Sequence, residues 1–169
     1  MPILKIRIYG DPILKKKAAS IDKIGPEEKR LFEDMANTMY SLKGIGLAAT
    51  QVGVEKQMMV IDVGQGLLKL ANPKIVKASC KRSGEEGCLS FPEITVKIRR
   101  PEKIVAEALN HEGKKIKIEA EGLLARALQH ELDHLAGIVI IDKIGIRQRL
   151  FIAKKLARLK KMGKSGITR

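Results

Sequence analysis

The sequence predicts an α+β fold in which mixed or antiparallel β-sheets pack around a buried central helix, with a second helix near the N-terminus and an amphipathic helix at the C-terminus. Three observations support this prediction. Alternating apolar and polar segments are joined by turn signals, apolar residues recur at helical spacing near both ends, and residues 123–137 are apolar around most of a helical circumference. A chain of 169 residues can form this fold as one domain, which we expect to span residues 1–162.

The N-terminal part is expected to be an arm followed by a helix. Residues 3–9 alternate apolar and basic side chains, and a Gly-Asp-Pro turn follows them. From Pro26 to Leu42 the apolar residues have helical spacing, and proline is favourable in the first turn of a helix. The next run, from Gly44 to Gln51, is rich in small residues. It either leaves backbone amides open to a partner or packs tightly against the central helix.

The middle of the chain is predicted to be extended. Residues 57–63 have the composition of a buried strand, and residues 67–76 continue as extended chain broken at an Asn-Pro pair. Residues 103–109 and 114–121 alternate and are joined by a short turn, which indicates a hairpin. His111 lies in that turn, where we expect it to be solvated.

The central helix carries a candidate metal site in the run Gln129-His130-Glu131-Leu132-Asp133-His134. Histidines four residues apart lie about one turn apart on the same helix face, so both imidazoles can reach one metal ion. Glu131 lies beside them, where a general base that activates a water at the metal belongs. Two histidines with this spacing could also be ordinary core or surface residues, but the glutamate between them favours the metal site.

A catalytic site normally has three protein ligands, so one ligand must come from elsewhere. The metzincin protease pattern would place a histidine at position 140, where the chain has Ile140. The remaining candidates are Cys80, Cys88 and His111, with Asp142 and other carboxylates as weaker ones. Cys88 follows a glycine and precedes an extended run, which suits a ligand presented from a strand or loop.

The C-terminal segment is expected to begin with a short strand, residues 138–141, and to continue as an amphipathic helix, residues 146–162. The predicted apolar stripe of this helix is Leu150, Ala153, Leu156 and Ala157, with basic residues on the opposite side. Residues 163–169 are predicted to be a basic, disordered tail.

The net charge of +14 is concentrated at the C-terminus, because ten of the 33 basic residues and no acidic residue lie between Lys143 and Arg169. Such a cluster favours a polyanion such as RNA, although it could be a solvated helix face without a partner. The chain has two cysteines, no apolar N-terminal segment and no apolar run near 18 residues. These features favour a cytoplasmic protein with free thiols and argue against a membrane protein.

Three motifs follow one another along the chain: Gly44-Ile45-Gly46-Leu47-Ala48-Ala49-Thr50-Gln51, Glu86-Gly87-Cys88-Leu89-Ser90 and Gln129-His130-Glu131-Leu132-Asp133-His134-Leu135. Together they closely resemble peptide deformylase, and the likeness covers nearly the whole chain. The helical C-terminus resembles the bacterial and organellar branch of the family. The implied activity is metal-dependent hydrolysis of the N-formyl group from formylmethionine at the N-terminus of nascent peptides, with release of formate.

The resemblance also implies roles for individual residues. Cys88, His130 and His134 would be the metal ligands, and Glu131 would be the acid and base. Gln51 and the backbone N–H of Leu89 would stabilise the oxyanion. The positions implied for substrate binding are Gly44, Ile45, Gly46, Glu86, Leu123, Arg126 and Ala127.

The implied metal is one Fe(II) ion, with Zn(II), Ni(II) or Co(II) as substitutes, because cysteine with two histidines suits zinc and iron alike. The implied partners are formylmethionyl nascent peptides and, through the basic C-terminal helix, ribosomal RNA. We expect a monomer. Two alternatives are a zincin-type endopeptidase with a downstream ligand, for which Cys88 is dispensable, and a structural zinc site formed by Cys80, Cys88, His130 and His134.

Overall fold

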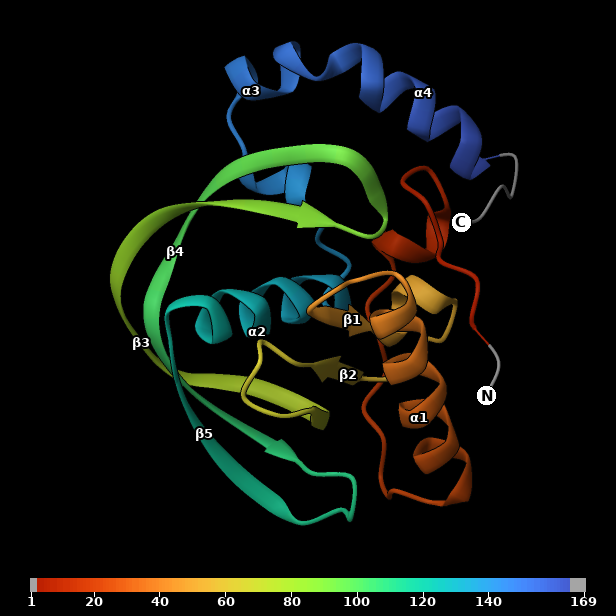
Figure 1. Cartoon of the computed structure of the whole chain (residues 1–169), viewed down its shortest axis with the longest axis vertical. Helices are drawn as coiled ribbons and strands as arrows, with labels where there is room; N and C mark the ends of the chain where they lie inside the picture. Colours follow the sequence, from red (N-terminus) through yellow and green to blue (C-terminus); the bar gives the residue numbers. More distant parts are fainter. Residues whose placement is uncertain (1–2, 165–169) are drawn as a thin grey trace.

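A five-stranded antiparallel sheet with the strand order β1-β2-β3-β4-β5 forms the body of the molecule (Figure 1). The computed structural model describes residues 3–164. The strands are β1 (Gly46–Ala48), β2 (Met58–Ile61), β3 (Leu68–Cys88), β4 (Phe91–Leu109) and β5 (Lys115–Glu121). The helices are α1 (Pro26–Ser41), α2 (Gly122–Leu135), α3 (Ile146–Phe151) and α4 (Ala153–Lys164), and the 3-10 turns are η1 (Pro12–Lys15), η2 (Ala49–Val52) and η3 (Ile140–Lys143). The predicted α+β class with an antiparallel sheet and several helices is confirmed.

The long hairpin of β3 and β4 curves around α2 and brings both of its ends close to that helix (Figure 1). Register shifts occur at Ala71/Lys74, Ile75/Lys77 and Gly87/Cys88. Because each shift interrupts the regular ladder, the ribbon can bend strongly at these points. The curvature returns Cys88, the last residue of β3, to the same side of the sheet as α2.

Two groups of buried apolar residues support this arrangement. One group joins the N-terminal arm, α1, the end of the β3–β4 hairpin and the C-terminal segment, and it includes Phe32, Met35 and Phe91. The other lies between α2 and the sheet and includes Leu128 and Leu135. Burial of such side chains stabilises the fold by about 1.5–3 kcal/mol each, so these contacts stabilise the packing of α2 against the sheet.

The structure corrects the prediction for residues 138–141, which do not form a strand. Their end lies in the turn η3, where the Asp142 carboxylate accepts a hydrogen bond of 2.9 Å from the backbone N–H of Val139. Val139, Ile140 and Ile141 are all buried. A short run of buried apolar residues has no periodicity that separates a strand from a turn, which explains the error.

The C-terminal helix also differs from its prediction, because it is broken into α3 and α4 at Ile152, whose φ is −100° and ψ is 6°. The break turns Leu150 outward, leaving it 68% exposed, and the predicted partners Ala153 and Ala157 are exposed as well. The observed apolar stripe is Ile152, Leu156, Leu159 and Met162.

Gly163 and Lys164 still belong to α4, and the rest of the predicted tail, residues 165–169, lies outside the described residues. Within residues 3–164, no helix combines the length and the apolar character that crossing a membrane requires.

Candidate metal centre

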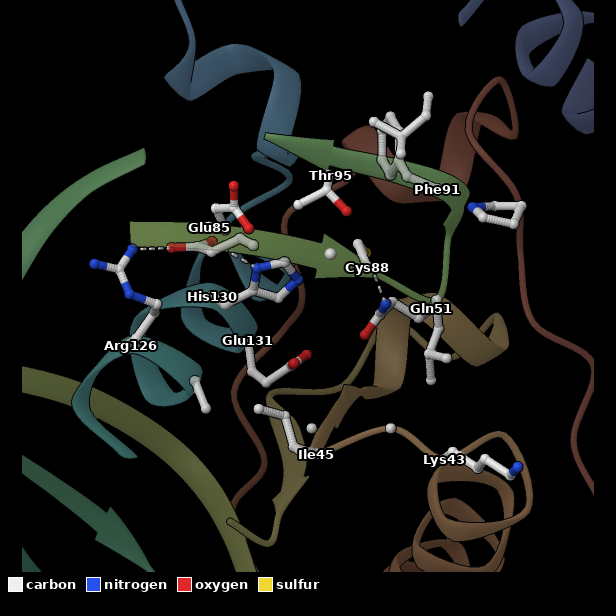
Figure 2. A pocket seen from close by; sticks show the side chains of 18 of the residues that line it. Lys43, Ile45, Gln51, Glu85, Cys88, Phe91, Thr95, Arg126, His130 and Glu131 are labelled. Atoms are coloured by element: carbon white, nitrogen blue, oxygen red, sulfur yellow. Dashed lines mark hydrogen bonds and ion pairs between the residues drawn. The ribbon is translucent and has the colours of Figure 1, made fainter. Parts of the chain in front are cut away.

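Cys88, His130 and His134 come together as a possible metal site at the end of β3 and on α2 (Figure 2). Their candidate ligand atoms all lie within 4.8 Å of one another, and Cys88 Sγ is 3.2 Å from His134 Nε2. The helical spacing supplies both imidazoles, and the returning hairpin supplies the thiol. The group includes neither Cys80, which is exposed, nor His111, which is exposed in its turn as expected. Asp142 instead pairs with Lys15.

Glu86 holds the ring of His130 in place. Its carboxylate accepts a hydrogen bond of 3.0 Å from His130 Nδ1, two from Arg100 and one from Arg126. Burial raises the pKa of Glu86, but the hydrogen bonds from His130 and Arg100 outweigh burial and leave the pKa at about 2. The ionised carboxylate thus fixes the proton on Nδ1 and leaves Nε2 of His130 available as a metal ligand.

Arg100 connects this carboxylate to the helix that carries the histidines. Its buried guanidinium donates to Glu86 and, over 2.7 Å, to Asp133 on α2. Lys143 also pairs with Asp133, at 3.0 Å. Sequence reasoning missed Arg100, but a signal was present: Ile94, Val96 and Ile98 alternate inward along β4, so residue 100 lies on the same inner face.

Glu131 lies beside the ligands and is only 4% exposed. Burial raises the pKa of Glu131 to about 7, so its carboxylate can both accept and return a proton near neutral pH. The backbone of Gly46 lies directly against it: a Cβ at that position would be 2.5 Å from Glu131 Oε1. Glycine at position 46 therefore leaves the space that the carboxylate occupies.

The chemistry of the donor set fits a divalent cation. Within residues 3–164, His134 Nδ1 and Glu131 Oε2 are buried without a hydrogen-bond partner. Burial lowers the pKa of His134 well below its usual range, which keeps it in the neutral form that binds metals. Burial also lowers the pKa of His130, but Cys88 and Glu86 outweigh this and raise it well above its usual range. Cys88 and Glu86 thus favour a positive charge at His130.

Gln51 reaches the site from η2. Its side-chain oxygen accepts a hydrogen bond of 2.8 Å from the backbone N–H of Ala48, so the amide nitrogen must point the other way. That nitrogen lies 3.5 Å from Cys88 Sγ and 3.3 Å from Ser90 Oγ. A fixed N–H donor is therefore present next to the candidate ligands.

A cavity of about 420 Å³ opens beside the metal ligands. Its floor includes Cys88, His130 and Glu131, and Leu89 and Gln51 also line it. All seven positions expected to bind substrate are on its wall: Gly44, Ile45, Gly46, Glu86, Leu123, Arg126 and Ala127. Within residues 3–164, β1 lies at the edge of the sheet and pairs with β2 alone, so one side of its backbone is available to an extended chain.

Comparison with known proteins gives consistent matches over the length of the chain. The family model described as "Polypeptide deformylase" matches residues 3–150. A peptide deformylase of Thermodesulfovibrio yellowstonii is 48% identical over 160 residues, which cover 92% of this chain and 97% of the relative. The crystal structure of peptide deformylase from Thermotoga maritima matches with a TM-score of 0.84 and 43% identity, over 86% of this chain and 99% of that one. A peptide deformylase structure from Legionella pneumophila matches with a TM-score of 0.89 and 36% identity, over 95% and 97% of the two chains.

Proposed function

The chain belongs to the polypeptide deformylase family, and we propose that the cavity beside Cys88, His130 and Glu131 is where it removes the N-formyl group from nascent peptides by metal-dependent hydrolysis. The observation that carries this proposal is the combination of one thiol and two imidazoles with a buried carboxylate at the floor of the cavity. The exposed Cys80 is not needed in this site.

Cys88, His130 and His134 would hold a single divalent ion. When bound, the ion supplies a Lewis acid that lowers the pKa of a water towards about 7 and polarises the formyl oxygen. One thiolate and two imidazoles suit Fe(II), Zn(II), Ni(II) and Co(II) alike. We propose Fe(II) because the resemblance to the family implies it, with the other three ions as substitutes. Activity of protein loaded anaerobically with each ion in turn would identify the preferred one.

Glu131 performs the proton transfers in this proposal. Its carboxylate takes a proton from the attacking water and returns it to the amine that leaves. Burial and the close backbone of Gly46 support this role, because they restrict where the carboxylate can lie. No second acid is then required, since the same oxygen atoms serve both steps.

The formyl oxygen gains negative charge as the water attacks. We propose that the side-chain N–H of Gln51 and the backbone N–H of Leu89 donate hydrogen bonds to it. The hydrogen bond from Ala48 to the other end of the Gln51 amide supports this, because it orients the donor before substrate binds.

The peptide itself would bind as an additional strand. We propose that backbone groups of Gly44, Ile45 and Gly46 pair with it along the open edge of β1. Leu123, Ala127 and the stem of Arg126, with Glu86 behind them, would surround the methionine side chain. Ile45 is 43% exposed and Leu123 is 54% exposed, so binding would also cover apolar surface that water now contacts.

We further propose that a monomer acts on nascent chains in the cytoplasm and docks on ribosomal RNA through its basic C-terminal helices. Arg147 and Arg149 on α3 and Lys154 and Lys160 on α4 are exposed basic side chains, which can contact phosphate groups. Arg147→Glu with Lys160→Glu should reduce cosedimentation with ribosomes; unchanged cosedimentation would argue against this docking surface.

Formate release tests the proposed reaction. Protein loaded anaerobically with Fe(II) should release formate from a formyl-Met tripeptide and no acetate from the acetyl-Met tripeptide of the same sequence. Mass spectrometry of the products would show whether any peptide bond is cut. Cleavage of a peptide bond without formate release would instead indicate a metallopeptidase.

A further inference from the structure

A second cavity lies next to the catalytic cavity, towards α4. It has a volume of about 270 Å³ and shares Pro92 and Glu93 with the catalytic cavity. Its other walls come from the N-terminal arm and one face of α4, through Ile8, Lys155, Arg158, Leu159 and Met162. We call this second cavity the α4 groove. Pro92 and Glu93 therefore lie between the two cavities, and only a ligand that extends beyond them from the catalytic cavity can reach the α4 groove.

The α4 groove is apolar at its base and cationic at its rim. Leu159 and Ile8 are buried, whereas Lys155 and Arg158 are exposed. Glu93 is the one acidic residue among those that line the groove. Within residues 3–164, Arg158 forms no ion pair. The groove thus presents net positive charge above an apolar base.

The junction between the two cavities is held in an unusual backbone conformation. Glu93 has a φ of +61°, which is uncommon for a residue other than glycine. Its backbone carbonyl accepts a hydrogen bond of 3.2 Å from Lys155 Nζ. The same lysine that lines the groove therefore anchors the wall that the groove shares with the catalytic cavity.

Arg126 lines the catalytic cavity and is held in place by its own hydrogen bonds. It donates to the carboxylate of Glu86 and to the backbone carbonyls of Arg82 and Ile98. In Figure 2, Arg126 and His130 lie on one side of Cys88 and Phe91 lies on the other. If a peptide whose formylated end is at Cys88 runs towards Phe91, Pro92 and Glu93, its later residues come next to the α4 groove.

We propose that the α4 groove binds residues of the formylated chain downstream of those in the catalytic cavity, and that Lys155 and Arg158 make it prefer acidic side chains there. This inference rests on the proposed function. An extended chain advances about 3.3 Å per residue, so a longer substrate extends further towards the groove than a tripeptide does. The apolar base of Ile8, Pro92, Leu159 and Met162 suits peptide side chains better than a phosphate backbone.

The test compares peptides of two lengths. A formyl-Met tripeptide is measured beside three formyl-Met nonapeptides that carry two Glu, two Gln or two Lys in their last five positions. Each nonapeptide kcat/KM is divided by that of the tripeptide for the same metal-loaded protein. We expect the Glu peptide to exceed the Lys peptide by about three- to tenfold at low salt. The difference should lie mainly in KM and should shrink as salt is added.

Variants assign this preference to the groove. Lys155→Glu with Arg158→Glu should reverse the order of the Glu and Lys peptides. Lys154→Glu is the matched control, because Lys154 is an exposed residue of α4 that does not line the groove. It should keep the wild-type order. Thermal unfolding of each variant would confirm that α4 remains folded.

Three results would overturn the proposal. The three nonapeptides could give equal ratios, the preference could survive the double reversal, or Lys154→Glu could reduce it as much as the double variant does. If the double variant lost only ribosome cosedimentation and kept the peptide order, RNA would be the ligand of the groove and the proposal would be wrong.

Absence of tripeptide turnover would contradict the proposed function instead. Fluorescence anisotropy of labelled, unformylated nonapeptides would then still test the groove, since acidic peptides should bind more tightly.

Discussion

Glu86 is the residue that joins the candidate metal ligands to the rest of the molecule. It accepts a hydrogen bond from His130 and from two arginines, and the pKa of about 2 keeps it ionised over the working range of pH. A carboxylate that orients a ligating histidine also makes the imidazole a stronger donor. We therefore expect Glu86 to matter for metal retention more than for contact with the substrate.

Glu86→Gln should weaken metal binding about 10- to 100-fold, because the amide cannot orient and polarise His130 as a carboxylate does. It should also destabilise the fold, because Arg100 keeps a buried charge without its main partner. Competition with a chelator measures the first effect, and urea unfolding measures the second. Glu85→Gln is the control, because Glu85 is the exposed neighbour. Equal metal affinity in both variants would contradict this role of Glu86.

The two cysteines should differ in their effect on the metal. Cys88→Ala should lose the bound ion on gel filtration, because it removes one of the three ligands. Cys80→Ala should retain it, because Cys80 is exposed and outside the group. Elemental analysis of both proteins gives the answer. Loss of metal from Cys80→Ala would instead support a structural zinc site formed by Cys80, Cys88, His130 and His134.

Local sequence accounts for part of the site and not for the rest. The pairing of His130 with His134 depends only on helical periodicity, so it could be predicted from the residues alone. The choice of Cys88 over Cys80 depends on where the β3–β4 hairpin returns, and the residues alone left both open. Only the likeness to a family selected Cys88. Arg100 was missed because its role requires the inner face of β4 to lie against α2.

Among the elements, α4 depends on very close packing against the N-terminal arm. A Cβ at Gly163 would lie 2.5 Å from the backbone carbonyl oxygens of both Ile8 and Tyr9. Neither carbonyl can move freely, since both belong to the backbone of the arm. Glycine lowers the intrinsic stability of a helix, so its presence at position 163 is explained by this close packing and not by helix propensity.

Gly163→Ala separates these two effects because they have opposite signs. Helix propensity alone would stabilise the protein by up to about 1 kcal/mol. We expect the clash to dominate and to lower the free energy of unfolding by about 1–3 kcal/mol. Urea unfolding of the variant measures the sign directly. A stabilised variant would mean that α4 does not pack on the arm as closely as described.

Elements with clear periodicity were predicted well, and those that depend on tertiary contacts were not. The helix α1, the strand β5 and the last part of β4 match their predicted positions closely, because alternation and helical spacing are local signals. The first part of β4, from Phe91, was not predicted. The break at Ile152 has no such signal. The bend lets Ile152, Leu156 and Leu159 face the core together. Its position depends on where the N-terminal arm and the sheet lie, which local sequence does not indicate.

At the scale of the whole molecule, the N-terminal arm and the C-terminal segment are tied to each other. Lys15 Nζ donates to the Asp142 carboxylate, which also accepts from the backbone N–H of Val139. Burial raises the pKa of Asp142, but the hydrogen bonds with Lys15 and Val139 outweigh it and lower the pKa below its usual value. The ionised form of Asp142 is therefore favoured by folding.

This lowered pKa predicts a pH-dependent contribution to stability. The contribution is fully present above the pKa that Asp142 has in the unfolded chain, about 3.9. It is lost as the pH falls through the lower pKa of Asp142 in the folded protein. Asp142→Asn should therefore reduce the free energy of unfolding by about 1 kcal/mol at pH 7. The difference from wild type should shrink below about pH 4.

Urea unfolding between pH 3 and pH 7 measures this difference, with the exposed residue changed in Asp22→Asn as a control for net charge. A difference that stays constant over this range would contradict the assigned pairing of Asp142.

The overall path of the chain could not be derived from periodicity. The register of β3 with β4 includes three shifts, and they curve the hairpin around α2. The shifts at Ala71/Lys74 and Ile75/Lys77 depend on pairing with residues far along the sequence, near the end of β4. Composition and alternation predicted an α+β chain with antiparallel strands, but only the structure shows how β3 carries Cys88 to the helix that bears His130 and His134.

The most direct test of the central claim is formate release by Glu131→Gln at equal metal content. The account predicts that Fe(II)-loaded wild-type protein releases formate from a formyl-Met tripeptide. It predicts that the glutamine variant, folded and equally loaded, is slower by at least about 10²- to 10⁴-fold, because glutamine cannot accept the proton of the water. Wild-type rates in the variant would show that Glu131 is not the base. A folded, metal-loaded wild type that releases no formate would contradict the proposed reaction itself.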